Sequence, residues 1–193
     1  MTAQIGDKYT FNGENYTIVA MSESVRFNPR QFGIMPASAC TACWAGYWCC
    51  YNVTEDGLFL NDLYINSFDN TYPPINDVLP LVDERSGEYV DYMGHHVYKD
   101  LNLKVKYTGK ILLGGNFISR YYIHMGFQRA WAYEELKELV FEDGTLVEVN
   151  DQSHIAAEIR EKLNGNKDFP SHSVKDFVDD SFSLDYKKKA WWL

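Results

Sequence analysis

The sequence predicts an α+β protein: a mostly antiparallel β meander, rich in hairpins and arranged as one sheet or a sandwich, followed by short C-terminal helices. Three turns support this expectation, because Asn12-Gly13, Asp56-Gly57 and Asp143-Gly144 each lie between β-rich runs. Asn-Gly and Asp-Gly suit two-residue hairpin loops, whose backbone needs positive φ. Aromatic residues make up 16% of the chain, which favours a sheet over a helical bundle. The 193 residues are enough to bury a core as a single domain, 1–193.

The first hairpin is expected to join Lys8–Phe11 to Glu14–Val19, followed by an irregular connection from Arg26 to Pro36. The stretch 39–51 is then expected to form the central strand. It contains all four cysteines, two of the five tryptophans and two of the fourteen tyrosines. Between Ala45 and Val53 both alternating sets of side chains are apolar, which is typical of a strand covered on both faces.

The proline-bearing segment 67–94 is expected to join two sub-halves, residues 1–66 and 95–150. The turn sequences 54–58 and 141–146 resemble each other. An old duplication would explain the likeness. Independent use of the same turn chemistry explains it too, and that is the interpretation we prefer.

The second sub-half repeats the alternation of β-rich runs and glycine turns, with a short helix between them. The expected elements are strands 101–107 and 110–113 around a Thr108-Gly109 hairpin turn, a break at Gly114-Gly115, a β-rich run at 119–125, a short helix at 127–135, and strands 136–141 and 145–149.

The tail, residues 151–193, is expected to be helical. Asp151 or Ser153 can cap a helix in which apolar residues repeat every four positions, at Ile155, Ile159 and Leu163. Asn164-Gly165 is the expected stop, and Ser173 can cap a second short helix. Exposure of Trp191-Trp192 would be costly, so these residues are expected to pack on the sheet or to form a homodimer contact.

The formal net charge of −9 argues against nucleic acid and membrane surfaces as partners, because both bind through positive charge. No run approaches the ~18 apolar residues of a membrane span. The first residues lack the basic and apolar regions of a secretory signal. We therefore expect a cytoplasmic protein whose four cysteines are reduced thiols.

The sequence favours a soluble binding protein. It contains no nucleophile elbow, dinucleotide fingerprint or P-loop, so no catalytic residue is assigned. Acidity and aromatic content favour a protein partner, and an inhibitor or immunity-type protein for a basic partner is one concrete form. Covering the core is the competing role for the loops concerned. The expected contact residues are Phe27, Phe32, Tyr72, Pro73, Pro74, His95 and His96.

The alternative is a metalloprotein or enzyme with a Cys/His site around Cys40 and Cys43 and zinc as its cofactor; otherwise no cofactor is expected. Two thiolates at this spacing can bind one zinc ion. Cys49 and His124 are the candidates to complete the site. Cys49 and Cys50 are neighbours on a strand and point to opposite faces, so only one of them could join. Free cysteines more often pack as small buried hydrophobic residues, which is the competing interpretation.

Overall fold

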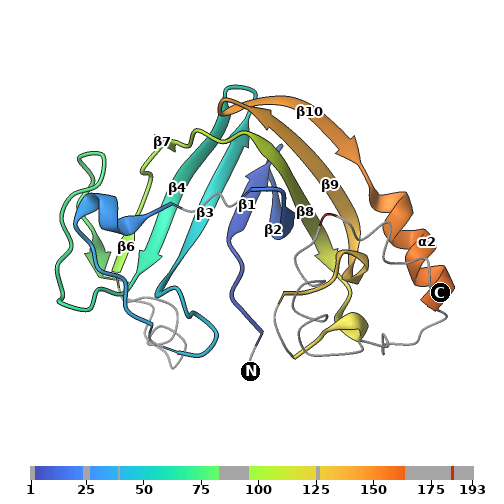
Figure 1. The fold of residues 1–193 in the computed structure, drawn as a ribbon, viewed down its shortest axis with the longest axis horizontal. Coiled ribbons are helices and arrows are strands. Elements are labelled where there is room, and N and C mark those ends of the chain that lie inside the picture. The colour runs from blue at the N-terminus through green and yellow to red at the C-terminus, as the bar shows by residue number, and fades with distance from the viewer. Residues whose placement is uncertain are drawn as a thin grey trace.

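The computed structural model describes residues 3–23, 27–38, 40–82, 96–124, 127–163 and 184 of the chain. Within them, ten strands form one mixed, mostly antiparallel sheet, and an α-helix follows the last strand (Figure 1). The predicted fold class is confirmed, as a single sheet and not a sandwich. The strands are β1 (Lys8–Phe11), β2 (Glu14–Met21), β3 (Tyr47–Thr54), β4 (Gly57–Ile65), β5 (Leu81–Val82), β6 (His96–Tyr98), β7 (Leu103–Lys104), β8 (Gly109–Phe117), β9 (Tyr133–Glu142) and β10 (Thr145–Asp151). The helices are α2 (Ser153–Leu163) and the 3-10 helices η1 (Pro29–Phe32), η2 (Ser119–Tyr121) and η3 (Ala130–Ala132).

The three hairpins predicted from their turns are all present. β1 pairs with β2 around Asn12-Gly13, and β9 pairs with β10 around Asp143-Gly144. β3 pairs with β4 around Glu55-Asp56, one residue earlier than predicted, so Gly57 pairs with Thr54 and begins β4. The strand order is β10-β9-β8-β2-β1-β3-β4-β6-β5, and β7 pairs with β4 beside this path. β1 and β3 run parallel, so the β1–β2 hairpin lies between the other two and links them into one sheet.

The sheet bends, and its two wings diverge from an apex where the β3–β4 and β9–β10 turns meet (Figure 1). A Cβ atom on Gly57 would lie only 1.9 Å from the carbonyl oxygen of Gly144, so this contact requires glycine. The chain after β7 closes the apex. The amide of Val105 donates to the carbonyl of Leu58 at 2.8 Å, and the amide of Gly144 donates to the carbonyl of Tyr107 at 2.8 Å.

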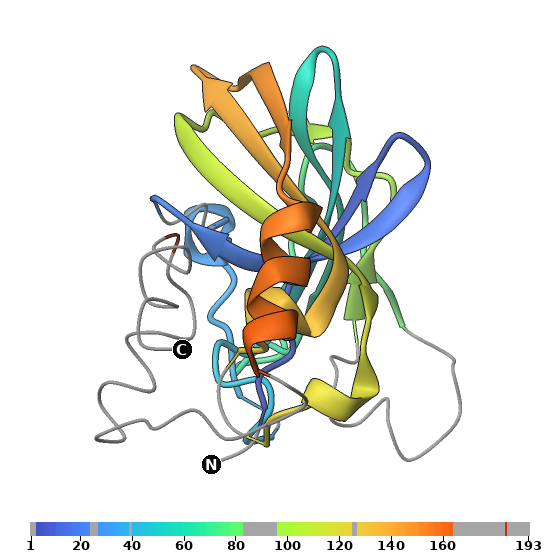
Figure 2. The ribbon, with the colours of Figure 1, turned by 90° about the vertical axis from the view of Figure 1, so that its right-hand side faces the viewer.

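Apolar clusters cover both faces of the sheet. On β8, the alternate residues Ile111 and Leu113 belong to the main core, whereas Leu112 between them belongs to the cluster that includes α2. α2 therefore packs on the face opposite the main core (Figure 2). The predicted apolar stripe is confirmed, because Ile159 and Leu163 are buried and Ile155 is half-buried.

The predicted hairpin around Thr108-Gly109 is wrong. β7 pairs with β4, while β8 pairs with β2 and β9. The predicted break at Gly114-Gly115 is also wrong, because β8 continues through both glycines. Tyrosine rings occupy the space beside them: a Cβ would lie 2.5 Å from the ring of Tyr133 at Gly114, and 2.9 Å from that of Tyr16 at Gly115. Glycine here admits an aromatic neighbour and does not end the strand.

Two further expectations need correction. The run 119–125 begins with the 3-10 helix η2 and contributes no strand over its described residues. The segment 127–135 forms the short helix η3 and then enters β9 at Tyr133. For 119–125, aromatic and β-branched composition misrepresents the local backbone. For 127–135, the helix is shorter than predicted because the chain enters the sheet at Tyr133.

Several predictions concern residues outside the described ranges: His95, part of the 67–94 crossing, the stop at Asn164-Gly165, the helix after Ser173 and the Trp191-Trp192 contact. The division into sub-halves also stays a prediction. None of the helices in the described ranges is long and apolar enough to cross a membrane.

Candidate functional site

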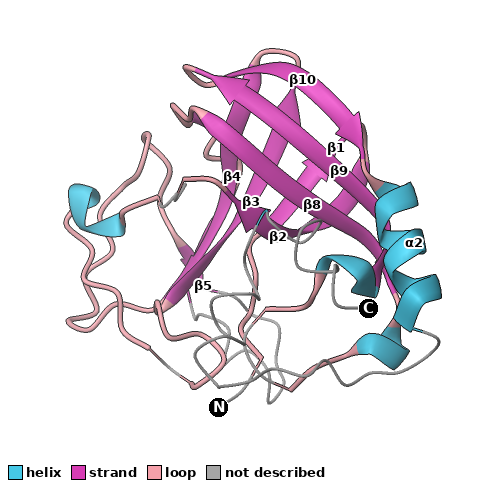
Figure 3. Cartoon of the chain, turned by 45° about the vertical axis from the view of Figure 1, so that its right-hand side comes forward, coloured by secondary structure: helices cyan, strands magenta, loops and turns pink. Residues whose placement is uncertain are grey.

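Loops gather at the end of the sheet that carries β5 (Figure 3), and they hold most of the predicted contact residues. The Tyr72 ring stacks on the His96 ring with centroids 3.7 Å apart. The amide of Ser67 donates to the Tyr72 hydroxyl at 3.0 Å. The Tyr98 hydroxyl donates to the carbonyl of Pro73 at 2.7 Å. Hydrogen bonds and stacking therefore fix the 66–82 loop on β6.

The loop that contains η1 lies against the same segment. An isolated antiparallel bridge joins Pro36 to Ser67, so the two loops are in contact. Phe27 stacks on Phe32 at 5.4 Å, and its carbonyl accepts a 2.7 Å hydrogen bond from the Tyr47 hydroxyl. Phe27 is buried in the main core, whereas Phe32 is half-buried. Phe27 therefore anchors the loop. A contact role for the predicted residues stays a prediction.

Two strongly exposed aromatic residues and one exposed methionine of this region are not among the predicted contact residues. Phe68 is 85% exposed, Trp44 72% and Met35 47%. Backbone hydrogen bonds join their segments: the amide of Phe68 donates to the carbonyl of Met35 at 2.8 Å, and the amide of Asn66 donates to the carbonyl of Gly46 at 3.0 Å. We call Met35, Trp44 and Phe68 the loop face.

Trp44 was expected in the central strand, and this is wrong because β3 begins only at Tyr47. Residues 40–46 form two successive turns, in which Cys43 donates to the carbonyl of Cys40 at 3.2 Å and Gly46 to that of Cys43 at 3.1 Å. Gly46 has a φ of +76°, and a Cβ there would lie within 2.7 Å of the Ala37 backbone. This close approach turns the chain and leaves Trp44 outside the core.

Charged residues are scarce around the loop face. The segments 27–38, 40–46 and 66–82 contain only Arg30, Asp69 and Asp77. Asp69 serves the loop itself, since its carboxylate accepts from the Ser67 hydroxyl at 2.7 Å. Hydrogen bonds from Ser67 and Thr71 lower the pKa of Asp69. The surface is therefore almost uncharged, and its exposed aromatic residues lie among neutral polar side chains.

The cysteines fall into two environments. Cys49 is buried in the main core, as the predicted covered strand requires. Cys43 is buried beside Trp48 and Tyr64, whose rings stack at 4.0 Å, and Cys40 and Cys50 pack at the edge of this cluster. Burial raises the pKa of Cys49 and raises the pKa of Cys43 and Cys50 to about 11. These three thiols are therefore protonated at neutral pH, which is typical of packing residues.

The residues named for the zinc alternative are not brought together as a ligand set. His124 is exposed and contacts Tyr122 edge-on at 5.0 Å, next to η2, whereas Cys43 packs between β3, β4 and β6. Across the described ranges, no group of three or more His, Cys, Asp or Glu side chains has a geometry that could hold a metal ion. The zinc site stays a prediction that this geometry does not favour.

Two tyrosines in the main core are unusual. Tyr9 on β1 and Tyr51 on β3 are register partners, and their rings stack at 4.9 Å. Both residues are almost fully buried. The Tyr51 hydroxyl lies within reach of the Cys49 thiol, whereas the Tyr9 hydroxyl has no hydrogen-bond partner within the described ranges. Burial, then the neighbouring Asp7 and Cys49, raise the pKa of Tyr9. An unpaired buried hydroxyl costs about 1–3 kcal/mol, so Tyr9 weakens the core.

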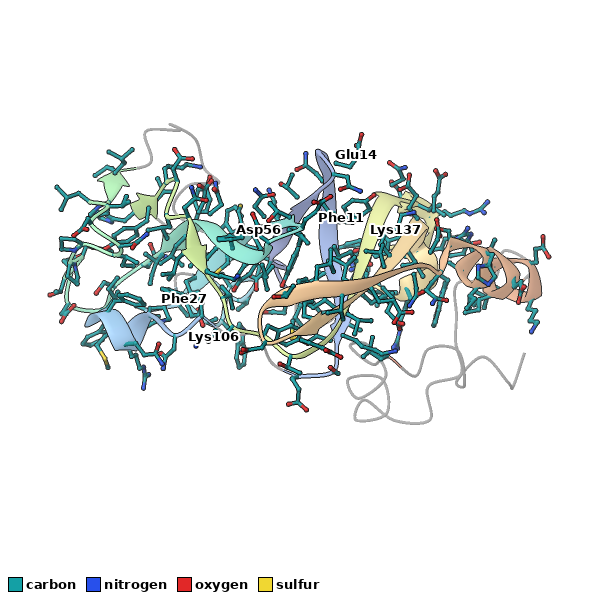
Figure 4. The ribbon with its side chains drawn as sticks, turned by 90° about the horizontal axis from the view of Figure 1, so that it is seen from above. Phe11, Glu14, Phe27, Asp56, Lys106 and Lys137 are labelled. Carbon is teal, nitrogen blue, oxygen red and sulfur yellow. The ribbon has the colours of Figure 1, made fainter. Side chains whose placement is uncertain are left out.

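The negative charge is concentrated on the other wing. Residues 133–151, the β9–β10 hairpin, contain seven carboxylates and one lysine, a net charge of −6 out of −9 for the chain. Lys137 on β9 and Phe27 near η1 mark the two wings in Figure 4. The strands of the acidic hairpin therefore lie on the wing opposite the loops around η1, and the turn of the hairpin lies at the apex between the wings. The carboxylates are Glu134, Glu135, Glu138, Glu142, Asp143, Glu148 and Asp151.

Comparison with protein-family models, curated proteins and solved structures finds no match to this chain.

Proposed function

We propose that the protein is a soluble binding protein that engages a basic protein partner and uses the loop face as its main contact. The single observation that carries the proposal is the exposure of Trp44 and Phe68 on loops that hydrogen bonds hold in place. The predicted contact residues Phe32, Tyr72 and His96 flank the same loops and are half-buried. They extend the surface that a partner would cover.

Exposed aromatic residues at this density favour an interface. Water-exposed Trp and Phe cost free energy unless a partner covers them, and contiguous apolar patches mark interaction sites on soluble proteins. Interface cores are enriched in aromatic residues and methionine and depleted in charge, as this surface is. Truncation of a central interface Trp commonly costs 2 kcal/mol or more, on the order of thirtyfold in affinity.

The net charge supports a basic partner. With a net charge of −6 on the β9–β10 hairpin and −9 on the whole chain, the field of the molecule would attract a basic protein and raise its association rate. The apolar loop face would then provide most of the affinity after encounter. An inhibitor or immunity-type role is one form of this function.

The test is a selection of ligands from a random peptide library displayed on phage, with the wild-type protein as target. Affinities of the selected peptides are then measured by calorimetry for wild type and for Trp44→Ser/Phe68→Ser. We expect affinity to fall about thirtyfold in this variant. Both residues are exposed, so the variant should fold.

The matched control is Phe117→Ser/Tyr122→Ser, which removes two exposed aromatic residues from the other wing. It should leave the affinities within about twofold of wild type. Selected peptides that bind Trp44→Ser/Phe68→Ser as tightly as wild type would refute the loop face as the contact. An excess of lysine and arginine in the selected peptides would support the basic partner.

A further inference from the structure

Among the described strands, β10 is the last of the sheet, and one of its edges carries no other described strand. Its ladder joins it to β9, and within the described ranges no second strand pairs with it. Only its start approaches the rest of the sheet, where Gly144 meets Gly57 at the apex. From Val147 to Asp151 the strand runs along the upper right of the molecule toward α2 (Figure 1). An edge of this kind presents backbone N–H and C=O groups that can pair with an added strand.

The side chains of this segment are unusually apolar for an open edge. Val147 is 50% exposed and Val149 is 45% exposed, and they flank the exposed Glu148. Val147 is the extra residue of a β-bulge, because the register with β9 shifts between Leu146 and Glu148. A bulge and a charged residue are devices that keep an edge from pairing indiscriminately. The two valines provide exposed apolar surface for a partner whose positive charge pairs with Glu148.

Charge decides which partner fits this edge. Glu148 and Asp151 lie on β10, and Glu134, Glu135 and Glu138 lie on β9. The nearby cations do not balance them: Lys137 pairs with Asp151 at 2.6 Å and Lys110 with Glu138 at 3.1 Å. Lys104 and Lys106 lie at the apex, beside the acidic turns. A second copy would bring an equally acidic edge and be repelled, whereas a basic strand would be attracted.

We propose that the edge of β10 from Val147 to Asp151 binds an extended basic peptide segment as an added β-strand. Backbone hydrogen bonds to β10 would provide the pairing, lysine or arginine side chains would lie beside Glu148, and apolar side chains would cover Val147 and Val149. This deepens the proposed binding function by giving the basic partner a second contact, in a segment able to become extended. It rests on the partner being basic and not on the loop face.

The test uses a short blocked peptide of alternating lysine and valine, titrated into the ¹⁵N-labelled full chain. Amide shifts should change at Val147–Asp151 and saturate with the affinity measured by calorimetry. The same peptide with its two central valines replaced by proline keeps the charge and cannot pair as a strand. We expect it to bind about tenfold more weakly. Equal binding of both peptides would show attraction by charge alone and would overturn the proposal.

Two protein variants locate the site. Glu148→Lys reverses the charge on the edge, and Glu161→Lys makes the same change of net charge on the exposed surface of α2. Affinity should fall about tenfold for Glu148→Lys and about twofold or less for Glu161→Lys. Equal losses would overturn the proposal, because they would reflect the net charge and not the edge.

The remaining outcomes separate this inference from the proposed function. Trp44→Ser/Phe68→Ser should bind the lysine–valine peptide with the affinity of the wild type, even if this variant loses affinity for other ligands. Peptide binding lost in that variant would place the peptide on the loop face and overturn the edge site alone. A dimer on sizing chromatography that dissociates in Glu148→Lys would show the edge occupied by a second copy, and would also overturn the proposal.

Discussion

The contact between Gly57 and Gly144 at the apex makes a quantitative prediction. A Cβ on Gly57 would lie 1.9 Å from the carbonyl oxygen of Gly144, and ordinary contact begins near 3.4 Å, so the two hairpin ends would have to separate by about 1.5 Å. Gly13, in the β1–β2 turn, is the matched control. It also has positive φ, +80° against +127° at Gly57, but a Cβ there meets nothing within 4 Å.

Alanine at either position costs about 1–2 kcal/mol for the left-handed backbone. At Gly57 the displaced apex adds a cost of the size of overpacking, about 1–3 kcal/mol. We therefore expect Gly57→Ala to be about 2 kcal/mol less stable than Gly13→Ala. Urea unfolding followed by tryptophan fluorescence should show a midpoint about 1 M lower for Gly57→Ala. Equal midpoints for the two variants would mean that the turns separate without cost, and the apex would not stabilise the fold.

Four other changes test the rest of the structure. Arg160→Met should lower the free energy of unfolding by about 2–3 kcal/mol, because the Arg160 guanidinium donates hydrogen bonds to the carbonyls of Trp131 and Tyr133. The control is Lys162→Met, since Lys162 is exposed on the same helix; this change should lower the free energy of unfolding by under about 0.5 kcal/mol in the same urea titration. Tyr9→Phe should raise stability by about 1 kcal/mol, and a loss of that size would reveal a hidden hydrogen-bond partner. Because the pKa of Cys43 is raised by burial to about 11, this thiol ionises first in the unfolded chain, and stability should fall as pH rises from about 9. The contribution of Cys43 is at most about 1.4 kcal/mol per pH unit, so the fall in Cys43→Ala should be less steep by up to that amount. Elemental analysis should find far less than one zinc per chain, and about one zinc, lost together with stability on chelation, would support the metalloprotein alternative.

The hairpins could be predicted because their information is local. Asn12-Gly13 and Asp143-Gly144 specify tight turns by their own backbone preferences, and both form; the third hairpin also forms, but around Glu55-Asp56, because Gly57 is drawn into β4. The pairing of β7 and β8 could not be predicted in this way. Whether the two strands beside a turn pair with each other depends on the other strands available to them. Here β7 pairs with β4, and β8 pairs with β9.

The candidate site likewise combines residues that could be predicted from the sequence with residues that could not. The predicted residues Phe27, Tyr72 and His96 come together because aromatic–proline loops commonly cover an edge of the core. The exposure of Trp44 and Phe68 could not be predicted, since apolar composition alone assigns both to the interior. Gly46 was the local signal for a turn before β3. The sequence does not show that the turn is needed, because the reason is the close approach of Gly46 to the Ala37 backbone.

The apex bears on the origin of the two similar turns. Gly57 must be glycine because of its contact with Gly144, and Gly144, at a φ of +79°, would place a Cβ 3.0 Å from the Val105 carbonyl oxygen. Each glycine is thus required by packing whatever its ancestry. The pairing around the turns also differs: β3 lies parallel to β1 in the first half, whereas β9 lies antiparallel to β8 in the second. A duplication would be expected to preserve the pairing, so turn chemistry under a shared packing constraint explains the likeness better.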